Sequence, residues 1–126
     1  MKQLALVCLG GAIGASMRWG IAMGLQWKWP KLAESFPYAT LLVNLTGCFA
    51  IGIGVGLLGR DGVKWGPELQ LLLIVGVCGS LTTFSTFANQ TLDLASGKAI
   101  LNIIASVAGG LFLAWAGMQL TGGKVA

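Results

Sequence analysis

The chain has 126 residues, of which 56% are hydrophobic and only 10% are charged. A soluble domain normally carries about 25% charged residues because its surface faces water, so this composition excludes a soluble globular domain. The formal net charge of +4 would suggest a nucleic-acid partner in a soluble protein, but the sequence contains no basic run. Scattered basic residues are typical of loops that anchor at lipid headgroups, and we expect no nucleic-acid partner.

Long apolar segments follow one another along the chain. A bilayer crossing needs about 20 mostly apolar residues, and tryptophans and basic residues stand near the segment ends, as they do at headgroup level. The first segment follows a basic start that resembles a signal peptide, but it is too long for one and is interpreted as a retained span. The sequence predicts an all-α membrane protein with one four-helix transmembrane domain over residues 1–126, whose spans are 4–25, 38–59, 69–92 and 99–120.

Glycines recur at intervals of four residues in the first two spans. Gly10 and Gly14 form such a pair in the first span, and Gly52 and Gly56 form one in the second. Small residues at this spacing let two membrane helices approach closely. We interpret these glycines as helix-packing positions.

A few polar side chains stand inside otherwise apolar spans. Asn44 is the only carboxamide of the second span, and Asn102 and Ser106 lie four residues apart in the fourth, which places them on one helix face. Polar side chains in a membrane are costly and usually face a partner or an ion pathway. For Asn44 both a pathway and an interhelical hydrogen bond are open, and Asn102 and Ser106 are weaker signals of the same kind.

The middle of the third span, Gly76–Phe87, is unfavourable for a helix because it combines glycines, threonines and serines. We expect the helix to break around Thr83–Phe87. Freed backbone groups at mid-membrane depth must face protein, water or an ion, and such breaks bind cations through carbonyls in other membrane proteins. The alternative is a continuous helix whose hydroxyls bond back to the preceding turn.

Phe84 and Phe87 are three residues apart and share a helix face. Two phenylalanines in a membrane helix are ordinarily packing residues. Here they enclose Ser85 and Thr86, and the positive edge of an aromatic ring can stabilise an anion without a counter-charge. We therefore consider them candidates for an anion pathway.

The basic residues are divided almost evenly between the two predicted sides of the membrane. The side of the amino terminus would hold Lys2, Arg60, Lys64 and Lys124, and the other side Lys28, Lys31 and Lys98, with Arg18 close to it. Orientation normally follows an imbalance of Lys and Arg in short loops. We therefore expect the chain to insert in both orientations and to pair into an antiparallel dimer, in which a partner faces the polar residues.

Several kinds of site are missing from the sequence. The chain has no histidine, and no carboxylate falls inside the predicted spans, although a proton-coupled exporter needs a titratable group there. The three cysteines, Cys8, Cys48 and Cys78, are far apart in apolar segments and suggest neither disulfides nor a zinc site. Without a nucleophile and base or a metal-ligand cluster, an enzyme is not expected.

Three segments together resemble the Fluc (CrcB) family of fluoride channels. They are Gly10–Ala15 with Arg18 and Trp19, Thr40–Asn44 with Gly47, and Gly76–Phe87. The most specific of them is the string Thr83–Phe87, preceded by Gly-x-x-Gly. The likeness covers the first three spans in order, and the length and the number of spans agree for the rest.

This resemblance implies a dual-topology homodimer in the bacterial inner (plasma) membrane, with two antiparallel pores through which fluoride leaves the cell passively. It implies the following roles: Phe84 and Phe87 as an aromatic box, Asn44 as a pore-lining residue, Ser85 and Thr86 beside the pathway, Arg18 at the aqueous vestibule, and the carbonyls of Gly79 and Thr82 as ligands of a structural Na⁺ between subunits.

The chain departs from the family pattern at two places. Many relatives have a glutamate where this chain has Gln90, and the fourth span lacks the tyrosine associated with the family's polar track. Two other functions remain alternatives: a small dual-topology multidrug transporter, which the missing membrane carboxylate disfavours, and a non-conducting structural subunit, in which Asn44 would be a packing residue.

Overall fold

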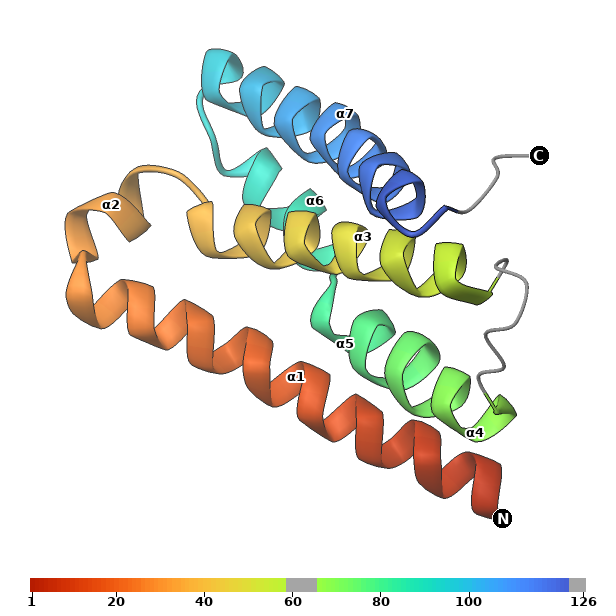
Figure 1. The fold of residues 1–126 in the computed structure, drawn as a ribbon. Helices are drawn as coiled ribbons and strands as arrows, with labels where there is room; N and C mark the ends of the chain where they lie inside the picture. The colour runs from red at the N-terminus through yellow and green to blue at the C-terminus, as the bar shows by residue number, and fades with distance from the viewer. Residues whose placement is uncertain (59–65, 123–126) are drawn as a thin grey trace.

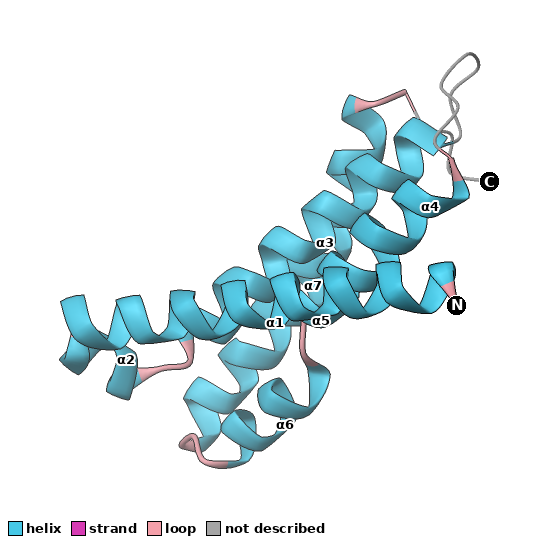
Figure 2. Ribbon diagram, turned by 90° about the horizontal axis from the view of Figure 1, so that it is seen from below, coloured by secondary structure: helices cyan, strands magenta, loops and turns pink. Residues whose placement is uncertain are grey.

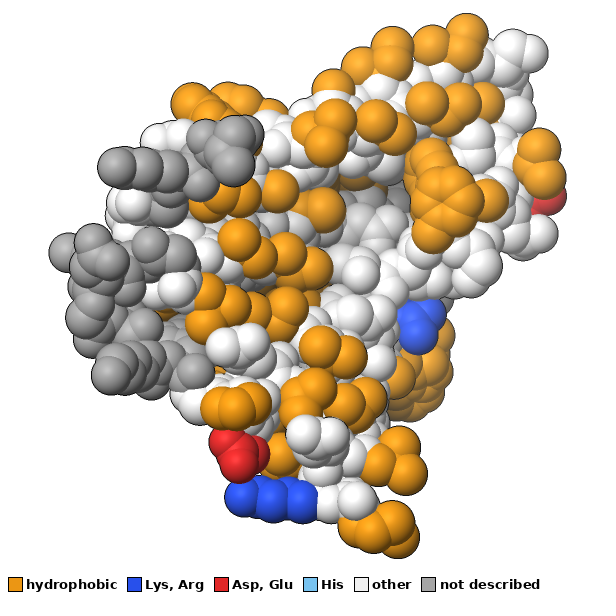
Figure 3. Space-filling model, turned by 90° about the vertical axis from the view of Figure 1, so that its right-hand side faces the viewer, with side chains coloured by type: hydrophobic (Ala, Val, Ile, Leu, Met, Phe, Trp, Pro, Cys, Tyr) orange, Lys and Arg blue, Asp and Glu red, His pale blue; other side chains and the backbone are white. Residues whose placement is uncertain are grey.

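The computed structural model describes residues 1–58 and 66–122. The described residues form helices and no strands, and four helical stretches are long and apolar enough to cross a membrane. The prediction of an all-α, multi-pass membrane protein is therefore confirmed. Figure 3 shows hydrophobic side chains spread over one face, with charged side chains at only a few places, as expected of a surface in lipid.

Three of the crossings are single helices, and a short helix lies between the first two. Their bounds are α1 (Lys2–Lys28), α2 (Pro30–Ser35), α3 (Tyr38–Leu58) and α7 (Ser96–Leu120). Helix α1 is longer than the predicted 4–25, and α2 was not predicted. Pro30 stands at the start of α2, where its missing N–H leaves no helical bond unmade.

The third crossing consists of several pieces. They are α4 (Pro67–Gln70), the π-helix η1 (Leu71–Cys78), α5 (Gly79–Leu81) and α6 (Phe84–Leu92). Thr82 and Thr83 between α5 and α6 have extended backbone conformations, with ψ of 150° and 116°, and Figure 2 draws this connection as a loop. The π-helix was not predicted from the sequence; such stretches are rare and often lie near functional sites.

The helices pack mainly in two pairs. Helix α1 runs along η1 and α5, and α3 runs along α7, whereas α6 packs less extensively against α7 and α3 (Figure 1). Glycines allow the close pairs: Gly10 lies against Gly76, and Gly52 lies against the backbone of α7 at Ala114. The predicted role of these glycines in helix packing is confirmed.

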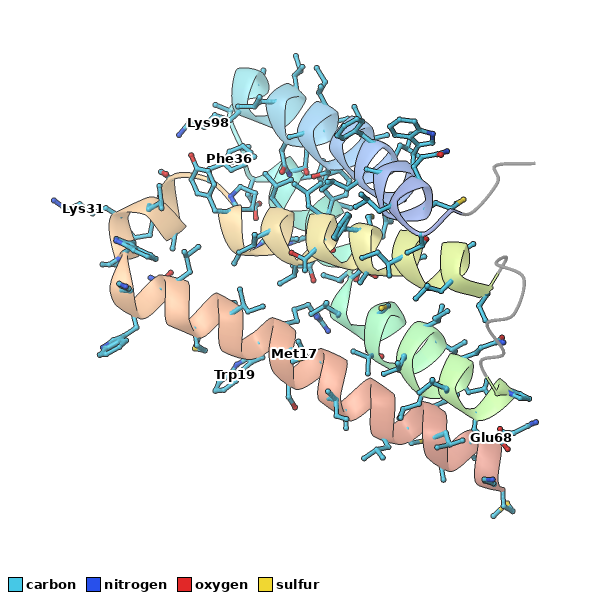
Figure 4. All side chains as sticks on the ribbon, viewed as in Figure 1. Met17, Trp19, Lys31, Phe36, Glu68 and Lys98 are labelled. Atoms are coloured by element: carbon cyan, nitrogen blue, oxygen red, sulfur yellow. The ribbon has the colours of Figure 1, made fainter. Side chains whose placement is uncertain are left out.

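Apart from Arg18, which lies inside α1, the charged residues that the structure describes lie near the ends of the helices. Lys2 forms an ion pair with Glu68 at one end (Nζ–Oε1 3.2 Å), and Lys31 and Lys98 lie at the other (Figure 4). There Lys98 donates a hydrogen bond of 2.9 Å to the carbonyl of Ser35. The remaining basic residues of the predicted tally on the first side, Arg60, Lys64 and Lys124, lie outside the described residues, as does the predicted turn at 60–62.

Candidate functional site

The carboxamide of Asn44 in α3 binds the backbone of Thr83. The N–H of Thr83 donates to Oδ1 of Asn44 over 2.8 Å, and Nδ2 of Asn44 donates to the carbonyl of Thr83 over 3.3 Å. Gly47, one turn further along α3, leaves room for the side chain of Thr82. The side chain of Asn44 thus replaces helical partners that the extended Thr82–Thr83 segment lacks, as membrane-buried backbone requires.

The side chain of Thr83 caps the start of α6. Its Oγ1 accepts a hydrogen bond of 3.4 Å from the N–H of Thr86 and donates one of 3.1 Å to the hydroxyl of Thr86. The hydroxyl of Ser85 lies 3.4 Å from the same oxygen. A threonine with extended backbone is a favourable N-cap, so the local sequence begins a new helix at Phe84.

Two carbonyls of this region are released from the usual helical pattern. In a continuous helix the N–H of Thr83 would bond to the carbonyl of Gly79, and the N–H of Thr86 to that of Thr82. These two N–H groups bond to Asn44 and to the side chain of Thr83 instead. The carbonyls of Gly79 and Thr82 therefore have the chemistry to accept another donor or a cation.

Phe84 and Phe87 form a tilted aromatic pair. Their ring centroids are 5.6 Å apart at an interplanar angle of 46°, a usual arrangement for interacting rings. Phe87 is buried, with 9% of its surface exposed, whereas Phe84 is 79% exposed. One ring is thus fixed inside the subunit and the other projects from it.

A groove of about 240 Å³ lies beside these rings, and we call it the α6 groove. It is lined by Asn44, Cys48, Ile51, Thr82, Thr83, Phe84, Phe87, Ser106 and Val107. The lining is mostly apolar, contains amide and hydroxyl groups, and includes no residue with a formal charge. Such a surface can donate hydrogen bonds to a small anion without a fixed cation that would trap it.

The structure brings only part of the predicted site together. Asn44, Phe84 and Phe87 line the α6 groove, whereas Ser85 and Thr86 are not among its lining residues. The groove is also lined by Cys48, Ile51 and Val107, which were not predicted for the pathway. They are ordinary apolar residues of a membrane span, so no local signal could have marked them.

The two polar residues of the fourth span have different surroundings. Ser106 lines the α6 groove, and its buried Oγ has no hydrogen-bond partner in residues 1–58 and 66–122. Asn102 is not part of the groove: its Nδ2 donates a hydrogen bond of 2.7 Å to the hydroxyl of Thr91 in α6. Both residues lie on one face of α7, one helical turn apart. Ser106 lies in the groove, whereas Asn102 makes a packing contact with α6.

Arg18 and Gln90 lie outside the α6 groove. Each has a buried side-chain atom, Nε of Arg18 and Oε1 of Gln90, without a hydrogen-bond partner in the described part of the chain. Gln90 lines a second groove of about 180 Å³, together with residues that include Glu34 and Asp93. The chain thus has an acidic region one turn beyond Phe87, separate from the uncharged lining of the α6 groove.

Comparison with known proteins identifies the family. The family model described as CrcB-like protein, Camphor Resistance (CrcB), matches residues 5–118. Curated relatives named fluoride-specific ion channel FluC are similar over 99% of this chain and their own full length: 40% identical in Shewanella sp. (strain ANA-3) and Shewanella frigidimarina (strain NCIMB 400), and 39% in Shewanella baltica (strain OS185). These names describe ion channels and not enzymes. The resemblance found in the sequence is thereby confirmed, and the chain belongs to the CrcB family.

Proposed function

We propose that this chain is a fluoride-selective channel that lets fluoride leave the cytoplasm passively through the bacterial inner membrane and so relieves fluoride toxicity. The observation that carries the proposal is the α6 groove, in which Asn44, Phe84 and Phe87 meet. The full-length similarity to proteins named fluoride-specific ion channels supports the choice of ion.

The chemistry of the groove suits a small, strongly hydrated anion. A carboxamide nitrogen carries two hydrogens; in Asn44 one of them is engaged with the carbonyl of Thr83, which leaves the second for an ion in the groove. The positive ring edges of Phe84 and Phe87 add favourable electrostatics, and the hydroxyl of Ser106 adds a donor. Ser85 and Thr86 would lie beside the pathway. None of these groups is charged, so the ion can also leave.

A second copy of the chain would complete the pathway. The Thr82–Thr83 segment is only half-buried in a single subunit and the ring of Phe84 projects from it, and lipid cannot satisfy backbone groups that stay unpaired. An antiparallel homodimer would cover this surface with protein. The nearly even division of Lys and Arg between the two sides supports insertion in both orientations.

The same region suits a structural sodium ion between the two subunits. The carbonyls of Gly79 and Thr82 are released from helical bonding because the N–H groups of Thr83 and Thr86 bond elsewhere, and carbonyl oxygens are suitable ligands for a hard cation. When bound, the ion would hold the break in the third crossing in place. Elemental analysis of the dimer after exchange into sodium-free buffer is expected to find retained sodium; a dimer that assembles without any would contradict this role.

Arg18 would lie at the aqueous vestibule. Its buried Nε has no hydrogen-bond partner in the described ranges, and a cation at the mouth would attract anions without binding them inside the pore. Replacement by glutamine is expected to slow fluoride entry more at low salt than at high salt, since screening weakens attraction over distance.

Fluoride efflux from proteoliposomes, followed with a fluoride electrode, tests the main proposal. We expect rapid efflux with the native chain and none with Phe84→Ile or Phe87→Ile, while both variants still assemble. The matched control is Phe112→Ile, because Phe112 belongs to a similar tilted pair with Trp115 in α7 (centroids 5.9 Å apart) but does not line the α6 groove. Unchanged efflux in both groove variants would refute the proposed pathway.

Three further measurements test the ion selectivity, the coupling to protons and the topology. Equal rates for chloride and fluoride would refute selectivity, efflux that requires a proton gradient would favour a coupled transporter, and no efflux at all would favour a structural subunit. A tag at the carboxyl terminus should be accessible from both sides of the membrane. Access from one side only would exclude dual topology.

A further inference from the structure

The carboxyl-terminal half of α6 is joined to α7 by one polar contact. Nδ2 of Asn102 donates to Oγ1 of Thr91 over 2.7 Å, and the same hydroxyl donates to the carbonyl of Phe87 over 2.7 Å. Asn102 is the most buried polar side chain described, at 1% exposure. A hydroxyl has one hydrogen and can both donate and accept, so the three groups form a directed chain from Asn102 to the backbone of Phe87.

This contact is unusual in one respect. Threonine hydroxyls in helices often bond to the carbonyl four residues earlier, and Thr46 in α3 does so with Leu42 over 2.8 Å. The hydroxyl of Thr91 also accepts a hydrogen bond from Asn102 of another helix, whereas the exposed Thr46 has no such interhelical bond among the described residues. Hydrogen bonds in a chain polarise one another, so the donor from α7 strengthens the bond that ends at Phe87.

Helix α6 needs contacts with other helices, such as the hydrogen bond from Asn102 to Thr91, to be stable. It has nine residues, and a helix this short has little stability of its own. The extended segment before it is held by Asn44 of α3, and its last turn is held by Asn102 of α7. Phe84 and Phe87 lie between these two carboxamides, so their positions depend on both.

We propose that Asn102 and Thr91 are positioning residues for Phe87. Through the carbonyl of Phe87 they hold its turn of α6 against α7 and keep its ring at the wall of the α6 groove. Neither residue lines the groove itself. The expected effect on fluoride efflux rests on the proposed function, since it assumes that the ring of Phe87 meets the conducted ion. The expected change in the position of the ring does not depend on that function.

Three variants separate the hydrogen-bond chain from simple packing. Thr91→Val keeps the branched shape and removes the hydroxyl, Thr91→Ser keeps the hydroxyl and removes a methyl group, and Asn102→Leu removes the donor. Thr46→Val is the matched control, because within residues 1–58 and 66–122 the removed hydroxyl bonds only to its own helix, at the carbonyl of Leu42. Thr91→Val should fold even if the buried Asn102→Leu does not, so it carries the test alone if necessary.

Two readouts are measured on each intact, reconstituted variant. The first is fluoride efflux from proteoliposomes. The second is the ¹⁹F NMR spectrum, in fluoride-free buffer, of protein with 4-fluorophenylalanine in place of Phe87, which reports the ring's surroundings independently of transport. We expect Thr91→Val and Asn102→Leu to slow efflux about threefold to twentyfold, the range for loss of one interhelical hydrogen bond in a membrane, and to shift or broaden the ¹⁹F signal. Thr91→Ser and Thr46→Val should resemble the native chain in both.

The outcomes are distinguishable. Native efflux together with an unchanged ¹⁹F signal in Thr91→Val would overturn the proposal. A Thr91→Ser variant as impaired as Thr91→Val would also overturn it, because that result would show that packing matters instead of the hydrogen bond. If the native chain conducts no fluoride, the proposed function fails. The ¹⁹F spectra then still decide whether Asn102 and Thr91 position Phe87.

Discussion

The two halves of the third crossing are held in different ways. The first half, residues 67–81, lies against α1 through backbone contacts that glycine makes possible, as where Gly76 meets Gly10. The second half, α6, packs less extensively and is held at its two ends by the carboxamides of Asn44 and Asn102. The packed half borders an apolar groove of about 230 Å³ against α3, lined by residues such as Ile53 and Ile74. The α6 groove is of similar size but also contains amide and hydroxyl groups, so the two halves differ in how they are held and in the chemistry beside them.

The largest effect on stability is expected from Gly76→Val, which disrupts the packing of the first half of the third crossing. A Cβ at this position would lie 2.8 Å from Cα of Gly10, and neither backbone can move aside without separating the helices. We expect a loss of stability of about 3 kcal/mol, at the upper end for overpacking, measured as thermal unfolding in detergent. Gly97→Val is the control, because a Cβ at Gly97 would meet no described atom within 4 Å outside its own helix. A native melting temperature for Gly76→Val would contradict the packing argument.

Asn44→Leu removes the hydrogen bonds that hold the segment before α6. It leaves the N–H and carbonyl of Thr83 without their partners, and each buried unpaired group costs about 1–3 kcal/mol. We expect a lower melting temperature together with strongly reduced fluoride efflux. Asn89→Leu, which changes an exposed carboxamide of α6, should affect neither. Reduced efflux at full stability would instead assign Asn44 to the pathway alone.

Thr83→Val should have a smaller effect, because it leaves the backbone of Thr83 bound to Asn44 and removes only side-chain hydrogen bonds at the start of α6. The lost bonds join Oγ1 of Thr83 to the N–H and to the hydroxyl of Thr86, and loss of an N-cap costs about 1 kcal/mol. Thermal unfolding of Thr83→Val and Thr83→Ser checks this, since serine keeps the capping oxygen and should restore most of the stability. Equal destabilisation by both would show that the methyl group matters and the cap does not.

The smallest effect is expected at the ion pair of Lys2 and Glu68, which joins the packed half to the start of α1. Both side chains are largely exposed, at 77% and 51%, and solvent screens such pairs. Lys2→Gln, Glu68→Gln and the double variant should therefore unfold at the native temperature. A clear coupling between the two substitutions would mean that charge, in addition to glycine packing, stabilises this half.

Much of the architecture could be predicted from the sequence. The four crossings follow from apolar length, which is a local property, and the small-residue spacing of Gly10 and Gly52 indicated where helices approach. The predicted fluoride-pathway residues Asn44, Phe84 and Phe87 prove to share one groove; their role in conduction stays a prediction.

The amino-acid sequence by itself determined that the chain crosses the membrane as helices and that the third crossing is locally weak, because hydropathy and helix propensity depend on neighbouring residues only. Tertiary structure alone decided which polar groups meet. Asn44 binds the backbone of Thr83, Ser106 faces the groove, and Asn102 one turn away binds Thr91. These pairings depend on how the packed helices are rotated and shifted against one another. Neighbouring residues in the sequence do not determine that arrangement.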